Sequence, residues 1–194
     1  MPKPPQGRVR WRAVDPKFTI KIQLAFALII QSFARLEHLI EMTISAVGNI
    51  EYEKATILTA GLGYQGKRDA LFGILGTANI TESQIDEIRA FLDEANKFNS
   101  IRNFIAHSIW VAGTRSGSIK PLAMRVRGNL KYMGVLDSER DYTESDLIGI
   151  SDKLALINNS YTAFLRRSGL TSRIDAEIEN IMQRSGLHPH SEGR

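Results

Sequence analysis

Arg102, Asn103 and His107 lie within six residues of one another and carry side chains suited to acid–base chemistry on a phosphate. A histidine can take up or release a proton near neutral pH. An arginine can stabilise negative charge on a phosphate as it reacts. Asn103 and His107 are four residues apart, so a helix places them on one face, and the long Arg102 side chain can reach toward the imidazole. Cleavage of RNA through its own 2′-hydroxyl requires this combination and no metal ion.

A periodic apolar stripe predicts the helix that positions these residues. Thr81 and Gln84 have the spacing of a capping box, in which each side chain bonds a backbone N–H at the helix entrance. A stripe of residues then recurs at steps of three and four from Ile85 to Ile109, apolar except at Asn99 and Arg102. We therefore expect one helix from Thr81 to about Val111.

Arg102 falls on the apolar side of this predicted helix. A charge on a core face is costly unless it is paired or faces a cleft. Glu37 and Glu41 border the apolar stripe of the first long helix and are the candidate partners of Arg102.

Similar periodicity predicts helices over residues 16–47, 52–60, 65–75, 143–168 and 172–184. Residues 118–136 alternate with a period of two instead, around a possible tight turn at residues 127–129, and predict a hairpin of two short strands. The fold class is therefore an all-α bundle with a small basic β-hairpin appendage. We expect a helical domain over 16–185, between a flexible basic tail at 1–15 and a polar tail at 186–194.

Positive charge is concentrated in two parts of the chain. The net charge is +4, but residues 1–17 carry +4, residues 95–136 carry +7 without an acidic residue, and the remainder carries −7. Such a one-signed stretch suggests a positive surface. In the predicted hairpin, Lys120, Arg125, Arg127 and Lys131 are candidates to bind RNA phosphates, although they can equally form a solvated face.

Composition excludes several other kinds of protein. The absence of cysteine rules out disulfides, thiolate catalysis and cysteine-bound metals, and the four histidines lack metal-ligand spacing. No dinucleotide or P-loop pattern is present, so we expect neither a cofactor nor a metal. The most apolar run, Ile22 to Ile30, is too short to span a bilayer, and no signal peptide is visible. We therefore expect a cytoplasmic protein without a membrane partner.

The segment from Arg102 to His107 resembles the Arg-x4–6-His motif of HEPN domains (higher eukaryotes and prokaryotes nucleotide-binding). In that family a polar residue, often asparagine, follows the arginine, as Asn103 does here. The resemblance implies a helical bundle of HEPN type that dimerises so that two motifs face one cleft. It also implies a metal-independent endoribonuclease acting on single-stranded RNA, of the kind found in toxin–antitoxin and antiphage defence systems, with an antitoxin or another regulatory protein as a possible partner.

The resemblance assigns a role to each residue of the motif. His107 would act as general acid or base, Arg102 would stabilise the charged phosphate, and Asn103 would orient His107 or bond the backbone. Two alternatives stay open. The chain can be a non-catalytic module that binds RNA, a nucleotide or a protein, or Arg102 and His107 can hold a dimer interface without any chemistry.

Overall fold

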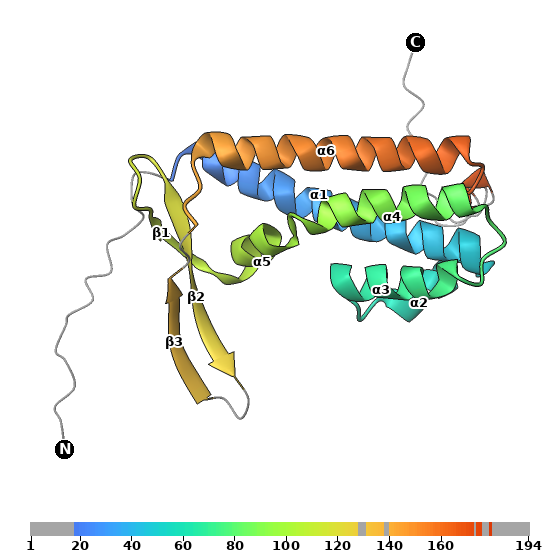
Figure 1. The fold of residues 1–194 in the computed structure, drawn as a ribbon, viewed down its shortest axis with the longest axis horizontal. Coiled ribbons are helices and arrows are strands. Elements are labelled where there is room, and N and C mark those ends of the chain that lie inside the picture. Colours follow the sequence, from blue (N-terminus) through green and yellow to red (C-terminus); the bar gives the residue numbers. More distant parts are fainter. Residues whose placement is uncertain (1–17, 128–130, 138–139, 173, 176–178, 180–194) are drawn as a thin grey trace, which may run out of the picture.

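The computed structural model describes residues 18–127, 131–137, 140–172, 174–175 and 179, and the side chains of 123–139 are outside this description. The tails expected at 1–15 and 186–194, and most of the helix expected at 172–184, lie outside the described residues. Figure 1 shows an elongated group of helices with a small sheet at one end.

Helices dominate the described part of the chain, as the sequence predicts. They are α1 (Ile20–Gly48), α2 (Tyr52–Thr59), α3 (Tyr64–Leu75), α4 (Glu82–Asn96), α5 (Asn99–His107) and α6 (Glu144–Arg167). None of the helices described here is long and apolar enough to cross a membrane.

The two longest helices, α1 and α6, lie side by side and run in the same direction (Figure 1). Near their first turns, the hydroxyl of Thr19 donates a hydrogen bond to Glu144 at 2.7 Å. Farther along, the hydroxyls of Thr43 and Tyr161 lie 2.7 Å apart in the core. Since consecutive helices in a simple bundle alternate in direction, this parallel pair requires the long connection that α2 to α5 and the sheet provide.

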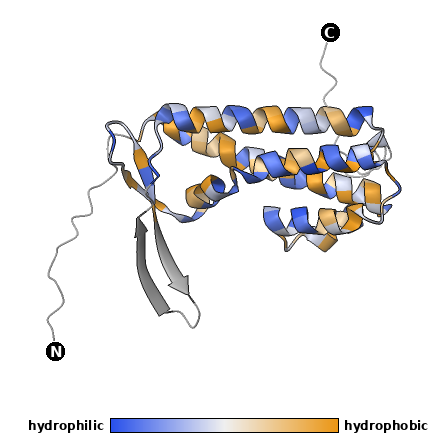
Figure 2. Cartoon of the chain, in the orientation of Figure 1, coloured by the Kyte–Doolittle hydropathy of each residue, from blue (hydrophilic) through white to orange (hydrophobic). Residues whose placement is uncertain are grey.

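The core lies between these helices and the shorter ones that cover them. Phe33 and Leu36 of α1 are fully buried, and Phe33 meets Tyr64 of α3 edge to face at 5.0 Å between ring centroids. On the other side, Phe91 of α4 stacks on Tyr161 of α6 at 5.3 Å. Figure 2 shows hydrophobic and hydrophilic residues alternating along each helix, as amphipathic helices require.

The helix predicted from Thr81 to about Val111 is two helices in the structure, and it ends earlier than predicted. The capping box of Thr81 and Gln84 is present, but α4 ends at Asn96 and α5 begins at Asn99. Lys97 and Phe98 form the turn between the two helices, here called the α4–α5 elbow. Their backbone N–H groups donate to the carbonyl oxygens of Glu94 and Ala95, three residues earlier, in the manner of a 3₁₀ turn. The elbow turns α5 toward α1.

The chain after α5 is a strand rather than more helix. Strands β1 (Ile109–Ala112), β2 (Ile119–Arg127) and β3 (Lys131–Asp137) form an antiparallel sheet in the order β1-β2-β3. The hairpin predicted at 118–136 is present as β2 and β3, and it projects away from the helices (Figure 1). Ile109, expected as the last member of the helical stripe, pairs with Leu122 across the sheet instead.

Candidate functional site

The Arg102–His107 segment occupies most of the short helix α5, between the α4–α5 elbow and β1. Ile101 is the buried residue that anchors α5 to the core. Asn103 and His107 are exposed and lie one helical turn apart. Arg102 is partly buried, with 26% of its side chain exposed. The helix therefore presents an amide and an imidazole to solvent and places the guanidinium at the border of the core.

Arg102 is held from two sides. Its Nη2 donates to Oε1 of Glu37 on α1 at 3.2 Å, and its Nη1 donates to the side-chain oxygen of Asn103 at 3.0 Å. Of the two acidic residues considered from the sequence, Glu37 is the one that contacts Arg102. Because a guanidinium carries five N–H donors, Arg102 retains donors for a phosphate while these two bonds are made.

Glu37 is shared with a buried lysine. Lys67 of α3 places its ammonium 3.2 Å from Oε2 of Glu37 and 2.8 Å from Oε1 of Glu41. Thr59 of α2 also donates to Glu41, at 3.3 Å. Glu41 therefore binds Lys67 and Thr59 rather than Arg102. Two carboxylates and two cations form a neutral chain of ion pairs, here called the Arg102–Glu37–Lys67–Glu41 network, which joins α5, α1 and α3.

Lys67 remains charged inside this network. Burial by itself would lower the pKa of Lys67, but its hydrogen bonds to Glu41 and Glu37 outweigh that effect and raise the pKa above its ordinary value. Sequence reasoning missed Lys67. The signal was its spacing, because Tyr64, Lys67 and Leu71 follow one another at helical steps and all three are buried. A lysine in a core stripe needs an acidic partner on the facing helix.

His107 is the last residue of α5 and its side chain is exposed. Among the residues that the structure describes, nothing hydrogen-bonds or ion-pairs with its imidazole, which is thus open to a ligand. Asn103 sits one turn before it, and the amide nitrogen of Asn103 faces no partner in the same described set. An open imidazole can transfer a proton, and a guanidinium that retains donors can bind a phosphate.

Trp110, which follows the motif, is a packing residue. Its ring lies 4.7 Å from Phe26 of α1 and 5.8 Å from Tyr142, measured between centroids. The sequence favoured this interpretation over a platform for stacking RNA bases. Trp110 thereby joins the sheet to the first turns of α1.

The cations expected to bind RNA lie on the sheet. Lys120 is half-buried on β2, opposite Val111 of β1. The backbones of Arg127 and Lys131 pair beside the hairpin turn. The side chains of Arg125, Arg127 and Lys131 lie outside the described residues. The structure thus places these positions on one hairpin, formed by β2 and β3.

A carboxylate holds the loop that links β1 to β2. Oδ2 of Asp141 accepts hydrogen bonds from the backbone and hydroxyl of Thr114, the backbone of Arg115 and the hydroxyl of Ser118, at 2.6 to 2.9 Å. These hydrogen bonds hold the pKa of Asp141 well below its usual range, and the one from the Thr114 hydroxyl has the largest effect. Gly113 leaves room for this arrangement, because a Cβ there would lie 2.8 Å from Cγ of Asp141.

Within the described part of the chain, no group of three or more histidine or acidic side chains is arranged to hold a metal ion. No protein-family model matches this chain, and no curated protein or solved structure does either. The functional assignment therefore rests on the geometry of α5 and its supporting network.

Proposed function

We propose that this protein is a metal-independent endoribonuclease of HEPN type that cleaves single-stranded RNA as a homodimer. The observation that carries the proposal is that one short helix, α5, bears both an exposed imidazole, His107, and a guanidinium, Arg102, that an ion pair to Glu37 holds in place. General acid–base catalysis by histidine and charge stabilisation by arginine are the two contributions that this reaction needs.

The proposed reaction is an internal transesterification. A neutral imidazole removes the proton of the 2′-hydroxyl, and the 2′-oxygen attacks the adjacent phosphorus. The bond from phosphorus to the 5′-oxygen breaks, and that oxygen takes a proton from an imidazolium. The products are a 2′,3′-cyclic phosphate and a 5′-hydroxyl. Arg102 donates hydrogen bonds to the phosphate oxygens while their negative charge is greatest.

A homodimer supplies the second histidine that this scheme uses. Base and acid must hold opposite protonation states at the start of the reaction, and two copies of His107 facing one cleft can divide these roles. The side-chain oxygen of Asn103 accepts a hydrogen bond from Arg102, and this bond helps to hold the guanidinium next to the exposed face of α5. Asn103 is therefore proposed as a positioning residue, and its free amide nitrogen can also bond the RNA.

The decisive experiment is cleavage of end-labelled single-stranded RNA in EDTA by the wild type and the His107→Ala variant. We expect the wild type to leave cyclic phosphate ends and the variant to lose at least about 10²-fold in rate. His38→Ala is the matched control, because His38 is also exposed on a helix but bonds Tyr52 at 2.9 Å. Equal cleavage by wild type and His107→Ala, with both folded by circular dichroism, would refute the mechanism.

A second candidate is a non-catalytic module that binds RNA, a nucleotide or a protein. The ion pair with Glu37 favours it, because that contact neutralises part of the charge that Arg102 would bring to a phosphate. This function predicts RNA binding with a steep salt dependence and no fragments under the same conditions. A toxin or defence role, an antitoxin partner and a cytoplasmic location stay predictions in either case.

A further inference from the structure

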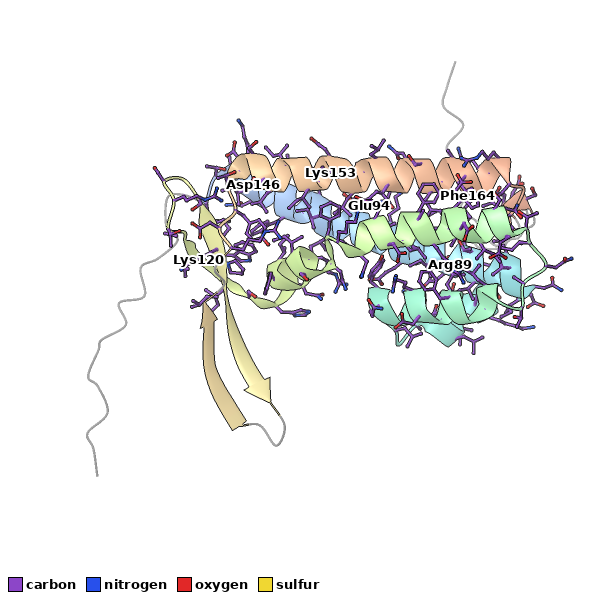
Figure 3. All side chains as sticks on the ribbon, in the orientation of Figure 1. Arg89, Glu94, Lys120, Asp146, Lys153 and Phe164 are labelled. Atoms are coloured by element: carbon purple, nitrogen blue, oxygen red, sulfur yellow. The ribbon has the colours of Figure 1, made fainter. Side chains whose placement is uncertain are left out.

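A hollow of about 1000 Å³ lies at the α4–α5 elbow. Its walls come from the elbow, the start of α5, the β1–β2 loop, residues 140–142 and the first turns of α6, including Phe98, Ile101, Arg115, Tyr142, Gly149 and Lys153. This volume is at the upper end of the range typical of small-molecule sites. In Figure 3, Glu94 and Lys153 mark the facing helices α4 and α6, and Asp146 marks the first turn of α6.

The walls of the hollow combine apolar rings with an excess of cations. Four basic residues line it, Lys97, Arg115, Arg140 and Lys153, against three acidic ones, Glu94, Asp141 and Asp146. Each acidic residue already has partners. Glu94 pairs with Lys97, Asp141 binds the β1–β2 loop, and Asp146 caps α6 through Thr143.

Lys153 is the cation least committed to the protein. It is exposed, and no ion pair or hydrogen bond joins its side chain to another residue that the structure describes. Arg140 lies over the ring of Tyr142 at 5.3 Å, which fixes a guanidinium beside an aromatic wall. A flat ring that carries a phosphate matches both features, since the apolar residues can pack on the ring while the cations bind the phosphate.

Gly149 keeps the space open from the side of α6. It lies in the helix interior, where glycine is less favourable than alanine, yet a Cβ built on it meets nothing within 4 Å. No close neighbour therefore requires a glycine at position 149. A larger residue at this position would extend into the hollow.

The hollow adjoins the face of α5 that carries Asn103 and His107. Ser100 lines the hollow, and Ser100, Asn103 and His107 follow one another at positions i, i+3 and i+7. Those positions share one face of a helix, with a rise of about 10 Å from the first to the last. A short stretch of a single RNA strand can span that distance.

We propose that this hollow binds a nucleotide of the RNA strand next to the bond that is cleaved, with Lys153 and Arg140 at its phosphate and Phe98 at its base. The assignment rests on the proposed function and adds the subsite that positions the strand along α5. Binding and cleavage can fail separately, so the experiment measures binding without cleavage.

The probe is a short fluorescein-labelled single-stranded RNA, titrated by anisotropy against full-length protein in which His107→Ala prevents cleavage. Adding Gly149→Leu fills the hollow, and we expect at least a tenfold loss of affinity. Gly73→Leu is the matched control, because Gly73 is exposed in α3 and a Cβ there also meets nothing within 4 Å. Equal affinity of the two leucine variants, both folded by circular dichroism, overturns the subsite.

The salt dependence of binding tests the phosphate contact itself. Replacing Lys153 by alanine removes one contact and reduces the slope of log affinity against log salt by about 0.7. Lys54→Ala, at an exposed lysine of α2 that pairs with Glu51, leaves the slope unchanged. An unchanged slope for Lys153→Ala overturns the assignment of that residue.

Adenosine monophosphate is titrated in parallel. If this mononucleotide binds and RNA does not, the hollow is not a site for an RNA strand. RNA that binds through the hollow but is never cleaved refutes the nuclease proposal and leaves the subsite standing.

Discussion

Glu37 and Arg102 are 65 residues apart in the chain, and their carboxylate and guanidinium meet at 3.2 Å. The second oxygen of Glu37 binds Lys67 at the same distance. One carboxylate thus connects the exposed helix α5 to a buried lysine of α3. The position of Arg102 depends on this connection, because α5 has only nine residues and buries one of them.

Replacing Glu37 by glutamine tests whether the ion pair positions Arg102. The glutamine amide has nearly the shape of the Glu37 carboxylate but lacks the negative charge that pairs with both Arg102 and Lys67. We expect the free energy of unfolding to fall by about 1.5–3 kcal/mol, the contribution of a hydrogen bond to a charged group, and RNA cleavage to fall by at least about tenfold. Urea denaturation and initial cleavage rates measure the two effects. Asp152→Asn, at an exposed position of α6, is the control for loss of a single negative charge.

The two readouts separate a positioning role from a structural one. A variant that loses stability but cleaves RNA at the wild-type rate would show that Glu37 supports the fold alone. Loss of cleavage at temperatures where the variant is fully folded would support positioning.

Replacing Lys67 by methionine removes the buried cation and leaves Glu37 and Glu41 without it. Breaking a buried pair in this way costs about 3–5 kcal/mol. The pKa of Lys67 is raised in the folded protein, so its contribution is fully present below the unfolded value of about 10.4 and is lost as the pH rises through the folded value.

The difference in stability between wild type and Lys67→Met should therefore stay constant from neutral pH to about pH 10 and shrink above it. Denaturation curves across this range measure the difference. Lys54→Met, at a position 63% exposed, is the control and should match the wild type throughout. A difference that shrinks well below pH 10 would contradict the assignment of a charged Lys67.

The sequence predicts most of the helical fold because the bundle follows from apolar periodicity. The capping box at Thr81 marked a true helix start, and the helix predicted over 143–168 is present as α6. The elbow at Lys97 and Phe98 escaped prediction. No glycine or proline marks it, and the steps of three and four continue through Ala95 and Asn99 as though the helix did.

The start of the sheet was hidden for a related reason. Ile109, Trp110 and Val111 extend the helical stripe, yet their β-branched and aromatic side chains also suit a strand, and pairing with β2 decides between the two. The candidate site was predictable as a motif but not as a network. Short spacing in the chain identified Arg102 and His107, whereas Lys67 is linked to Arg102 only through Glu37, which requires the tertiary packing of α3 on α1.

The Asp141 carboxylate should make the β1–β2 loop sensitive to acid. Its pKa lies well below the usual range, so its contribution to stability is present above the unfolded value of about 3.9 and is lost as the pH falls through the lower folded value. Asp141→Asn removes the charge. We expect a lower thermal midpoint than the wild type at neutral pH and a gap that narrows below about pH 4.

Thermal denaturation at several pH values measures this gap, with Asp152→Asn as the control because Asp152 is exposed. Hydrogen exchange adds a local measurement, since the backbone amides of Thr114 and Arg115 donate to Asp141 and should lose protection in the variant. If the difference in thermal midpoint between wild type and Asp141→Asn widened in acid, the hydrogen bonds to the Asp141 carboxylate would not be what stabilises the loop.

Gly113→Ala should disturb the same loop by steric overlap. A Cβ on Gly113 would overlap Oγ of Ser118 and lie 2.8 Å from Cγ of Asp141, and neither group can withdraw without breaking the hydrogen bond between them. Overpacking of this kind costs about 1–3 kcal/mol, so the urea midpoint should fall. Gly73→Ala is the matched control, because it adds the same methyl group in open space within a helix and should raise stability slightly. Stability equal to the wild type for Gly113→Ala would mean that the loop can shift away from Asp141, and the amides of Thr114 and Arg115 would then exchange faster even though the global stability is unchanged.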